Sequence, residues 1–519
     1  MARLCAYLLA FEGQVSLFRA GKQLRKEGII SMIEKERFAK IVGDANVIDD
    51  QAILKSYASD FSFIAPTMPG LVVKVSNLDE IQKIVNLARE TKTPLIPVSS
   101  CGPHFNGDTV PTTGGAVIVD LSGMKKIIRV DRINRTVMFE PGVNFEELID
   151  ACRAEGMRLN IPLLPRKTKS VSGSLLERQP VTMPGYHWDI GDPLNCMEII
   201  FGTGEAFRTG SAAGPGTLEE QWAAGGGQVL ASGPTQASWY RMIGGAQGTM
   251  GIAGWTSARC EILPRLQEPY MIGCRDINQV LEMTRWLVRL RIPNECFILN
   301  KTALAAMMAI DHSRDYMRIF DSLPEWVLFY NLAGYEYFPE ERIQAHEEDV
   351  WKLAQKNNLI PARAVGEVNA FDLLKAVQSV CPEPYWKLRA KGASHEIPVL
   401  SNFQNVDKIV LAMYQAAGRV RYPTNDLGVY IQPLVQGANY HIEFTMFYDP
   451  DSAKEKAIVH KFADVAVGAI TEQHGFFSRP YGEHVKEIIN RDAATRQSLD
   501  RVKNMFDPDR IMNPGKLCF

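Results

Sequence analysis

The sequence lacks the features that would point to a nucleic-acid or membrane partner. Its 57 Lys and Arg residues are balanced by 59 Asp and Glu residues, and the net charge of −2 gives no bulk attraction to polyanions. The apolar N-terminal run, residues 4–11 (LCAYLLAF), is much shorter than the roughly 20 residues that a membrane-spanning helix needs. We therefore expect no nucleic-acid partner and no integral membrane segment.

Several cofactor and metal signatures are also missing. The nine cysteines are scattered singly without a CxxC pair, which excludes the spacing of a zinc ribbon or a ferredoxin-type cluster. An odd, dispersed set of cysteines in a large chain favours reduced thiols and a cytoplasmic location. No GxGxxG joins a strand to a helix, and GxxxxGK[ST], HExxH and GxSxG do not occur. Rossmann and P-loop nucleotide binding thus have no sequence support.

What the sequence does contain is a mixed pattern of strands and helices. With 519 residues, of which 46% are hydrophobic, the chain can bury a large core. Apolar spacing predicts strands at 71–76, 94–99, 116–121 and 251–262, a hairpin at 127–140, helices at 78–90 and 144–155, longer helices within 270–400, and strands within 429–448. Because helices and strands alternate without strict βαβ repetition, we expect an α+β fold.

Three loops carry small residues that let the backbone approach a ligand closely. They are residues 99–107, 170–174 (SVSGS) and 244–251 (GGAQGTMG). Free backbone N–H groups in such loops can hold a pyrophosphate without a helix dipole. Each loop alone is weak evidence, since glycine-rich turns are usually only turns. Their order along the chain is more informative than any one of them.

That order resembles the vanillyl-alcohol oxidase and p-cresol methylhydroxylase family of FAD-linked oxidases. The similarity is carried by PVSSCGPHFNG, SVSGSLLER, MEIIFGTGEAFRTG, GGAQGTMGIAGWTSARCEILP and the C-terminal FDPDRIMNPGK. It implies a two-part FAD-binding domain with an inserted α+β cap, and it is nearest to the branch that acts on para-substituted phenols. The implied organisation is an N-terminal arm (1–39), an FAD-binding domain (40–265), a cap or substrate domain (266–475) and a C-terminal segment returning to the FAD domain (476–519).

The resemblance also implies which residues hold FAD. They lie in the three loops and the C-terminal segment: Ser99, Ser100, Cys101, Gly102, Pro103, His104, Ser170, Ser172, Gly173, Glu177, Gly248, Gly251, Ile252 and Lys516. The sequence departs from the family pattern in the first loop, which is poorer in glycine than usual. Pro103 stands where some relatives link flavin covalently through a histidine. Asn106 replaces the tyrosine with which phenol oxidases hold the phenolic oxygen, and this weakens the phenol interpretation.

His441 occupies a strand position comparable with a flavin-linking histidine of the family. It is expected either to attach FAD covalently or to be a half-buried strand residue. The 2-hydroxy-acid relatives use an HxGDGNxH motif with a GEHG loop, and this chain keeps Asn439 and His441 together with residues 482–484. Leu434 replaces the first histidine, so we expect no metal, because a catalytic site normally has three protein ligands.

The resemblance assigns catalytic roles to four residues. Arg479 and Tyr481 come from a loop that covers the flavin in the family, and a guanidinium beside a phenol can stabilise an anionic oxygen. Asp189 and His441 are candidates for proton transfer, and Tyr186 and His187 compete with Asp189 because the local alignment slips. An exposed loop aspartate is the alternative for Asp189.

The implied activity is oxidation of a small organic substrate by hydride transfer to flavin N5. The expected substrate is a para-substituted phenol or an aromatic alcohol. A 2-hydroxy-acid dehydrogenase of the glycolate or lactate type, and the flavin subunit of an electron-transfer complex, are the alternatives. Expected partners are the small-molecule substrate, an electron-acceptor protein such as a cytochrome, and further copies of the chain in a homo-oligomer.

Overall fold

The apolar residues between positions 47 and 120 build a four-stranded sheet. The computed structural model describes residues 35–234 and 238–519, so most of the expected N-terminal arm lies outside the described residues. The strand order is β1 (Val47–Ile48), β2 (Leu71–Lys74), β4 (Val117–Asp120) and β3 (Leu95–Val98), with β2 and β3 both parallel to β4. Helices α2 (Gln51–Tyr57) and α3 (Leu78–Thr91) pack on opposite faces of this sheet.

Helix α3 shows why this region folds as its spacing predicts. The Asn77 side chain caps the helix by accepting a hydrogen bond from the Glu80 N–H. Ile81, Ile84 and Ala88 lie on one face and are fully buried against the sheet. The predicted helix and the strands on either side of it are therefore present, with ends that differ by one or two residues.

A second sheet follows and is antiparallel. Its order is β5 (Ile127–Asp131), β6 (Thr136–Phe139), β10 (Gly251–Ile262), β8 (Leu194–Phe201) and β9 (Ala206–Arg208), and β7 (Met157–Leu159) pairs with the far end of β10. The helices of this part are α4 (Phe145–Ala154), α5 (Val171–Leu176), α6 (Leu218–Ala223) and α7 (Trp239–Ile243). Asn144 and Glu147 form a capping box at the start of α4.

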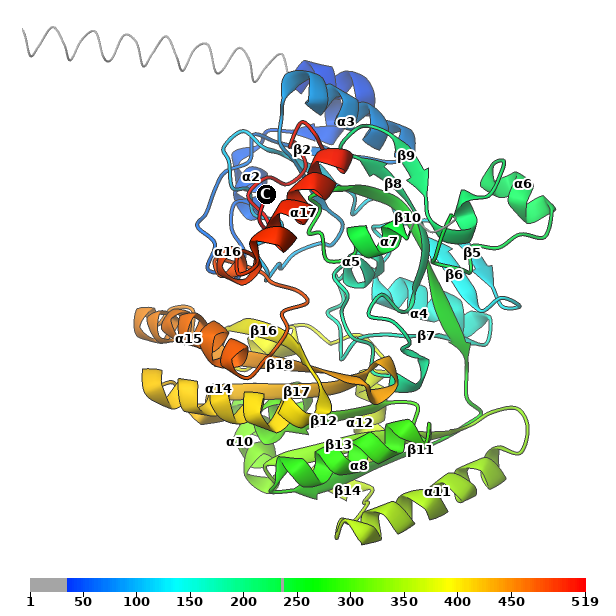
Figure 1. Cartoon of the computed structure of the whole chain (residues 1–519), viewed down its shortest axis with the longest axis vertical. Coiled ribbons are helices and arrows are strands. Elements are labelled where there is room, and N and C mark those ends of the chain that lie inside the picture. Colours follow the sequence, from blue (N-terminus) through cyan, green and yellow to red (C-terminus); the bar gives the residue numbers. More distant parts are fainter. Residues whose placement is uncertain (1–34, 235–237) are drawn as a thin grey trace, which may run out of the picture.

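The C-terminus returns to these two sheets. Helices α16 (Val485–Ile489) and α17 (Ala493–Phe506) lie beside them in Figure 1, coloured orange to red. Phe506 stacks on Phe201 of β8 with ring centroids 4.4 Å apart. Met512 forms a parallel bridge with Leu95 of β3. The two sheets and the C-terminal segment thus form the upper lobe of the molecule.

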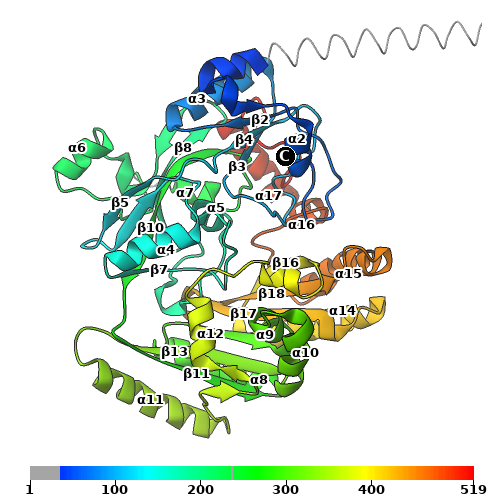
Figure 2. The same cartoon turned by 180° about the vertical axis from the view of Figure 1, so that it is seen from behind.

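The lower lobe is a six-stranded antiparallel sheet covered by helices on both faces (Figures 1 and 2). Its strand order is β11 (Leu266–Cys274), β13 (Trp326–Gly334), β12 (Cys296–Asn300), β17 (Leu427–Leu434), β18 (Asn439–Tyr448) and β16 (Ala393–Ser401). One face packs on α8 (Ile277–Arg289), α11 (Pro339–Lys356), α14 (Val406–Val420) and α15 (Ala453–Glu472). The other packs on α9 (Lys301–Met308), α10 (His312–Ser322), α12 (Ala370–Val377) and α13 (Trp386–Arg389).

The sequence prediction for the middle of the chain was incomplete. It foresaw the helices within 270–400 but none of the four strands β11, β12, β13 and β16. Strand β13 is buried at every position, so its sequence WVLFYNLAG is apolar except at Asn331 and does not alternate between apolar and polar residues. Such a run cannot be distinguished from a buried helix by periodicity.

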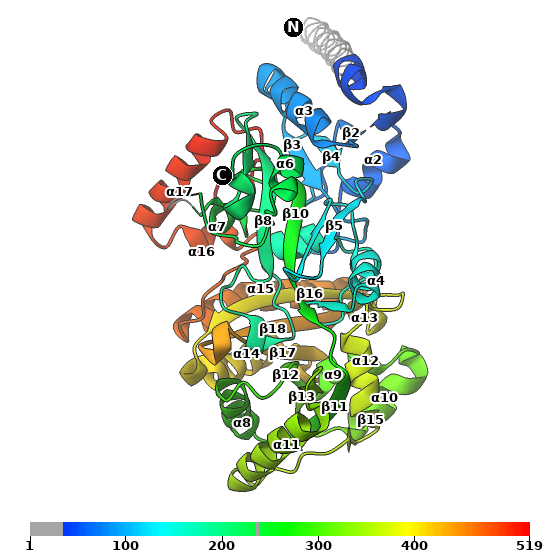
Figure 3. The same ribbon diagram turned by 90° about the vertical axis from the view of Figure 1, so that its right-hand side faces the viewer.

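Strand β18 explains how the lower lobe meets the upper one. Its even-numbered residues Ile442, Phe444 and Met446 are apolar and fill the core against α14 and α15. On the opposite face the strand carries His441 and Glu443. In Figure 3, β16 and β18 lie nearest the upper lobe among the labelled strands of the lower-lobe sheet. None of the helices within the described residues combines the length and apolarity needed to cross a membrane.

Candidate active site

A large cavity lies between the two lobes. Its walls come from the three small-residue loops and β10 of the upper lobe, and from α13, β16, β17 and β18 of the lower lobe. The empty space is about 1640 Å³, including the part open to solvent. Both lobes therefore contribute to one continuous space.

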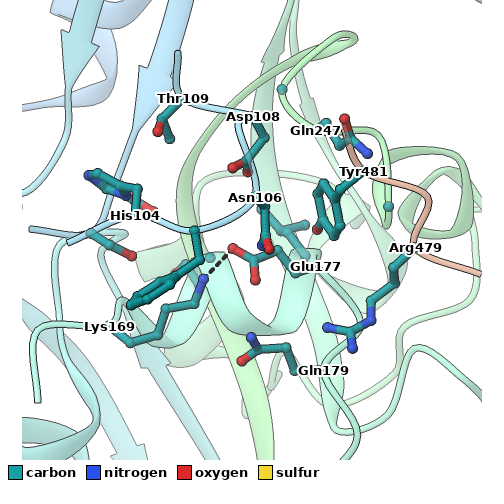
Figure 4. Close-up of a pocket in the computed structure, with 18 of the residues that line it drawn as sticks. His104, Asn106, Asp108, Thr109, Lys169, Glu177, Gln179, Gln247, Arg479 and Tyr481 are labelled. Carbon is teal, nitrogen blue, oxygen red and sulfur yellow. Dashed lines mark hydrogen bonds and ion pairs between the residues drawn. The ribbon is translucent and has the colours of Figure 1, made fainter. Parts of the chain in front are cut away.

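The first loop contributes Ser99, Ser100 and His104 to the cavity wall, together with Asn106 and Asp108 (Figure 4). The Ser100 hydroxyl accepts a hydrogen bond from the Ser170 N–H at 3.0 Å, which joins this loop to the second. Burial, with further contributions from Arg166 and Lys169, lowers the pKa of His104 to about 3, so its imidazole is neutral at physiological pH.

Three other residues predicted in this loop do not line the cavity. They are Cys101, Gly102 and Pro103. The carbonyl oxygens of Cys101 and Gly102 instead accept hydrogen bonds from Arg166 at 2.7 Å and Thr168 at 3.0 Å. The loop therefore presents its serines and His104 to the cavity and ties the intervening turn to the neighbouring segment.

The second loop forms the start of α5. Ser172, Gly173 and Glu177 line the cavity, whereas Ser170 lies behind it and caps the helix by accepting from the Gly173 N–H at 2.9 Å. One carboxylate oxygen of Glu177 pairs with Lys169. The other is buried and has no hydrogen-bond partner among the described residues, so it is free to accept one from a ligand.

The third loop and the start of β10 contribute Gly248, Gly251 and Ile252. Gly248 has φ +71°, and a Cβ there would lie 2.6 Å from the Pro97 ring. Only glycine lets the backbone follow this path without strain. The Asn513 side chain donates to the carbonyls of Asp108 and Gln247 at 2.8 and 2.7 Å, so the C-terminal segment fastens the first loop to the third.

Lys516, the remaining predicted cofactor residue, does not line the cavity. Its ammonium is buried without a hydrogen-bond partner among the described residues, and the charges of Asp108 and Asp60 act on it. Burial, reinforced by Glu177, raises the pKa of the cavity residue Asp108 to about 6. Lys516 thus lies behind an acidic part of the wall and does not contact the open space.

Arg479 and Tyr481 enter the other end of the cavity, as Figure 4 shows. They come from the segment that connects α15 to α16. The Arg479 guanidinium lies 3.7 Å from the Glu443 carboxylate, and only 6% of its side chain is exposed. Burial, together with the charges of Glu177 and Asp108, holds the pKa of Tyr481 well above its ordinary value, so its hydroxyl keeps its proton and can donate it in a hydrogen bond.

A buried cluster of charged residues forms the floor of the cavity beside Arg479 and Tyr481. The sequence analysis did not predict this cluster. Lys387 of α13 lies 2.6 Å from Glu443 of β18 and 2.9 Å from Glu396 of β16, and all three line the cavity. A signal for Glu443 was present in the sequence. It follows His441 by two residues in a strand and therefore shares its face.

His441, the predicted flavin-linking residue, does not line the cavity. It is 1% exposed and lies on the strand face beside Glu443, with Nε2 3.7 Å from the Glu443 carboxylate, and its ring is 5.8 Å from that of Tyr430. Burial lowers the pKa of His441 and so favours the neutral imidazole. In this arrangement, Glu443 and Tyr430 present their side chains to the cavity and His441 does not.

Asp189, the predicted proton-transfer residue, does not line the cavity either. It forms an ion pair with Arg241 at 2.5 Å outside the cavity. Its two competitors point elsewhere as well. His187 accepts a hydrogen bond from the Val435 N–H at 3.1 Å, and the Tyr186 hydroxyl lies 3.0 Å from that of Tyr335. The segment thus packs against the lower lobe and supplies no proton-transfer group to the cavity.

Within the described part of the chain, no three His, Cys, Asp or Glu side chains are grouped as a metal ion would require. The cavity does fit a flavin dinucleotide. Two serine-containing loops and a glycine-rich loop converge on it, an unpaired carboxylate oxygen of Glu177 faces it, and aromatic side chains close it from the lower lobe.

Comparison with known proteins agrees with this fit. Residues 69–210 match the FAD binding domain family, and residues 263–517 match the C-terminal domain of the FAD linked oxidases. The glycolate oxidase subunit GlcD of Bacillus subtilis is 22% identical over 494 residues, covering 93% of this chain and 96% of the relative. The flavoprotein subunit of 4-cresol dehydrogenase [hydroxylating] from Pseudomonas putida is 24% identical over 521 residues, covering 93% and 94%.

Among solved structures, p-cresol methylhydroxylase with substrate bound superposes with a TM-score of 0.81 at 18% identity, covering 94% of this chain and 96% of that one. The predicted fold, an FAD-binding domain with an α+β cap, is thereby confirmed. The chain is an FAD-linked oxidase or dehydrogenase, built from the FAD binding domain and the C-terminal domain of the FAD linked oxidases, with FAD as its cofactor.

Proposed function

We propose that the protein oxidises a para-substituted phenol or an aromatic alcohol. One observation carries this proposal: an arginine and a tyrosine stand at one end of a cavity whose lower-lobe wall is aromatic. Tyr385, Trp386 and Tyr430 form that wall, and Phe105 joins it from the upper lobe with its ring 5.7 Å from that of Tyr385. Flat aromatic surfaces of this kind suit an aromatic ring.

The chain's own residues would bind and polarise such a substrate. FAD, when bound, accepts the hydride that leaves the substrate carbon. Arg479 and Tyr481 would both donate to the phenolic oxygen, and these charge-assisted bonds strengthen as negative charge develops there. The Arg479 side chain is buried, which raises the strength of its interaction with the substrate oxygen.

A 2-hydroxy-acid substrate is the second candidate, and the similarity to the glycolate oxidase subunit favours it. In that case Arg479 would bind the substrate carboxylate. The charges of the cavity floor argue against it. Glu396 and Glu443 share one lysine, so a third carboxylate would be repelled unless Arg479 were released from Glu443.

Flavin reduction in the absence of oxygen tests the choice between these classes. Purified holoprotein would be mixed with 4-alkylphenols, 4-hydroxybenzyl alcohols and 2-hydroxy acids, and the loss of the flavin band followed. We expect bleaching by the para-substituted phenols and none by the same compounds methylated on the phenolic oxygen. Bleaching by lactate or glycolate alone would replace this proposal with the second candidate.

We also propose that a separate protein re-oxidises the reduced flavin. The Pseudomonas relative is named as a flavoprotein subunit, which supports a separate electron-acceptor protein such as a cytochrome. If the chain only relays electrons within a larger complex, neither substrate class will reduce it. A homo-oligomer and a cytoplasmic location remain predictions, which light scattering and cell fractionation can check.

A further inference from the structure

The loop that carries Arg479 and Tyr481 has no regular structure of its own. Residues 477–483 lie in neither a helix nor a strand. Within the described residues, the backbone of this segment makes a single hydrogen bond, in which the Gln247 side chain donates to the Pro480 carbonyl oxygen at 2.6 Å. Because Pro480 lies between Arg479 and Tyr481, this bond fixes the backbone at the point from which both side chains extend.

The two side chains are held to different degrees. The Arg479 guanidinium is fixed from the lower lobe by Glu443, 3.7 Å away. The Tyr481 hydroxyl has no hydrogen-bond partner among the described residues, so its direction depends on the backbone that Gln247 holds. Figure 4 shows Gln247 beside the loop that bears Tyr481 and Arg479 at this end of the cavity.

Gln247 is itself held firmly by its neighbours. It lies in the third loop with φ +52°, a left-handed conformation that is unfavourable for a residue with a Cβ. The Asn513 side chain donates to its carbonyl oxygen at 2.7 Å, and the Gly245 N–H donates to the Leu176 carbonyl oxygen at 2.7 Å. Strained residues persist where the surrounding structure fixes them, and they gather at functional sites. The third loop is therefore a rigid support from which the Gln247 side chain reaches segment 477–483.

Segment 477–483 also separates two spaces. Arg479 and Tyr481 line both the active-site cavity and a smaller pocket beside β16 and α15, whereas Pro480 lines only the smaller pocket. Gln247 lines only the cavity, so its bond to Pro480 holds this wall from the cavity side. A shift of the segment toward the smaller pocket would carry Arg479 and Tyr481 away from the cofactor loops.

The contact requires an amide at position 247. A carbonyl oxygen only accepts hydrogen bonds, so the Gln247 amide must present its NH2 group. A glutamate of the same shape would place a carboxylate against the Pro480 carbonyl, and a methionine of similar length would offer no donor. These two replacements therefore remove the bond with and without an added charge.

We infer that Gln247 is a positioning residue, which fixes segment 477–483 against the third loop and so sets where Arg479 and Tyr481 stand relative to the flavin. The inference rests on the proposed function in taking these two residues as the groups that bind the substrate oxygen. Gln247 acts through them, and it couples the loop that holds the cofactor to the segment that binds the substrate. A misplacement of about 1 Å in such groups costs about 100-fold in rate.

Gln247→Met and Gln247→Glu test this role in the holoprotein. We expect the limiting rate of flavin reduction by 4-ethylphenol to fall about 10- to 100-fold in both variants. The half-saturating concentration should change less, because the displaced groups act mainly on charge that develops during hydride transfer. The FAD content should stay at the wild-type level, and its loss in both variants would overturn the inference by making Gln247 a cofactor residue.

Gln82 of α3 provides the matched control. Its side chain donates to the Gly204 carbonyl oxygen at 2.8 Å, and neither residue lines the cavity. Flavin reduction in Gln82→Met and Gln82→Glu should therefore proceed at the wild-type rate. A loss of rate in Gln247→Glu alone would assign the effect to the added charge and overturn the inference, as would equal losses in the Gln82 and Gln247 variants.

Chemical labelling of Arg479 gives a readout that does not depend on turnover. Only 6% of its side chain is exposed, so phenylglyoxal, which reacts with guanidinium groups, should modify it slowly in wild type. Loss of the Gln247 bond, which leaves its acceptor unpaired, should speed this labelling at least about fivefold. Arg491, whose side chain is 37% exposed, is the internal reference, and mass spectrometry of the two peptides measures both rates.

Labelling of Arg479 at the wild-type rate in both Gln247 variants would overturn the inference. If no phenol reduces the wild-type flavin, the proposed function fails, and the labelling rates alone then decide whether Gln247 fixes the segment. Faster labelling in both variants would support that role, and unchanged labelling would reject it.

Discussion

Arg479 is placed to bind the substrate and not the cofactor. Its guanidinium approaches the lower-lobe residue Glu443, whereas the cofactor loops belong to the upper lobe. A charge-assisted hydrogen bond to a substrate oxygen contributes about 1.5–3 kcal/mol. Arg479→Ala should therefore lower kcat/KM roughly 10- to 150-fold. Arg479→Lys should restore only part of this loss, because lysine lacks the planar fork.

Rapid mixing of enzyme and substrate checks the predicted losses in kcat/KM, because it measures the rate of flavin bleaching. FAD content, read from the flavin band of the purified variants, serves as the control and should be unchanged. Arg479→Ala protein that is reduced at the wild-type rate would show that another group binds the substrate oxygen, and Tyr481 would be the first to test.

The candidate site shows which residues a sequence can reveal. Arg479 and Tyr481 were predicted because their loop resembles the one that covers the flavin in the family, and both lie in the cavity wall. Glu396 and Glu443 were missed, because a glutamate in a strand normally faces solvent. Their meeting depends on the pairing of β16 with β18, which sets Pro398 opposite Glu443, and this register is fixed only by the folded sheet.

At the scale of loops, backbone shape rather than side-chain chemistry forms the cofactor site. Gly248 lines the cavity with φ +71°, and Gly225 has a similar φ of +80° in a turn that does not line it. Valine at either position costs about 1–3 kcal/mol of backbone strain. Only at Gly248 would it also push against Pro97 and narrow the cavity.

Gly248→Val should therefore weaken FAD binding at least tenfold, while Gly225→Val leaves it within about twofold. Quenching of flavin fluorescence, when FAD is added to the apoprotein, measures both affinities. Equal losses in the two variants would mean that general destabilisation, and not the shape of this loop, controls binding.

At the scale of helices, strands and loops, local sequence patterns predicted some elements correctly. Helix α3 and strand β10 were predicted well, since one is amphipathic and the other is bounded by glycine and proline. The three loops were selected because they are rich in small residues, and they converge on one cavity. That convergence joins segments about 150 residues apart in the chain, and it follows from strand order, which local patterns do not encode.

At the scale of the whole molecule, the cavity lies between two lobes that each have their own core. The upper lobe supplies the loops, and the lower lobe supplies α13, β16 and the polar face of β18. A ligand that contacts both lobes stabilises both, because it binds only when they are folded and together. At a concentration 100 times its Kd, such a ligand adds about 2.7 kcal/mol to the free energy of unfolding.

FAD should therefore slow amide hydrogen exchange in both lobes, by up to about 100-fold where exchange requires opening of the site. We expect protection at residues 99–109 in the upper lobe and at residues 385–400 in the lower lobe, measured by mass spectrometry with and without FAD. Helix α11, on the outer side of the lower lobe in Figure 1, provides the internal control and should show little change. Protection confined to the upper lobe would contradict a cofactor enclosed by both lobes. It would also separate Arg479 and Glu396 from the flavin, since both depend on the lower lobe for their position.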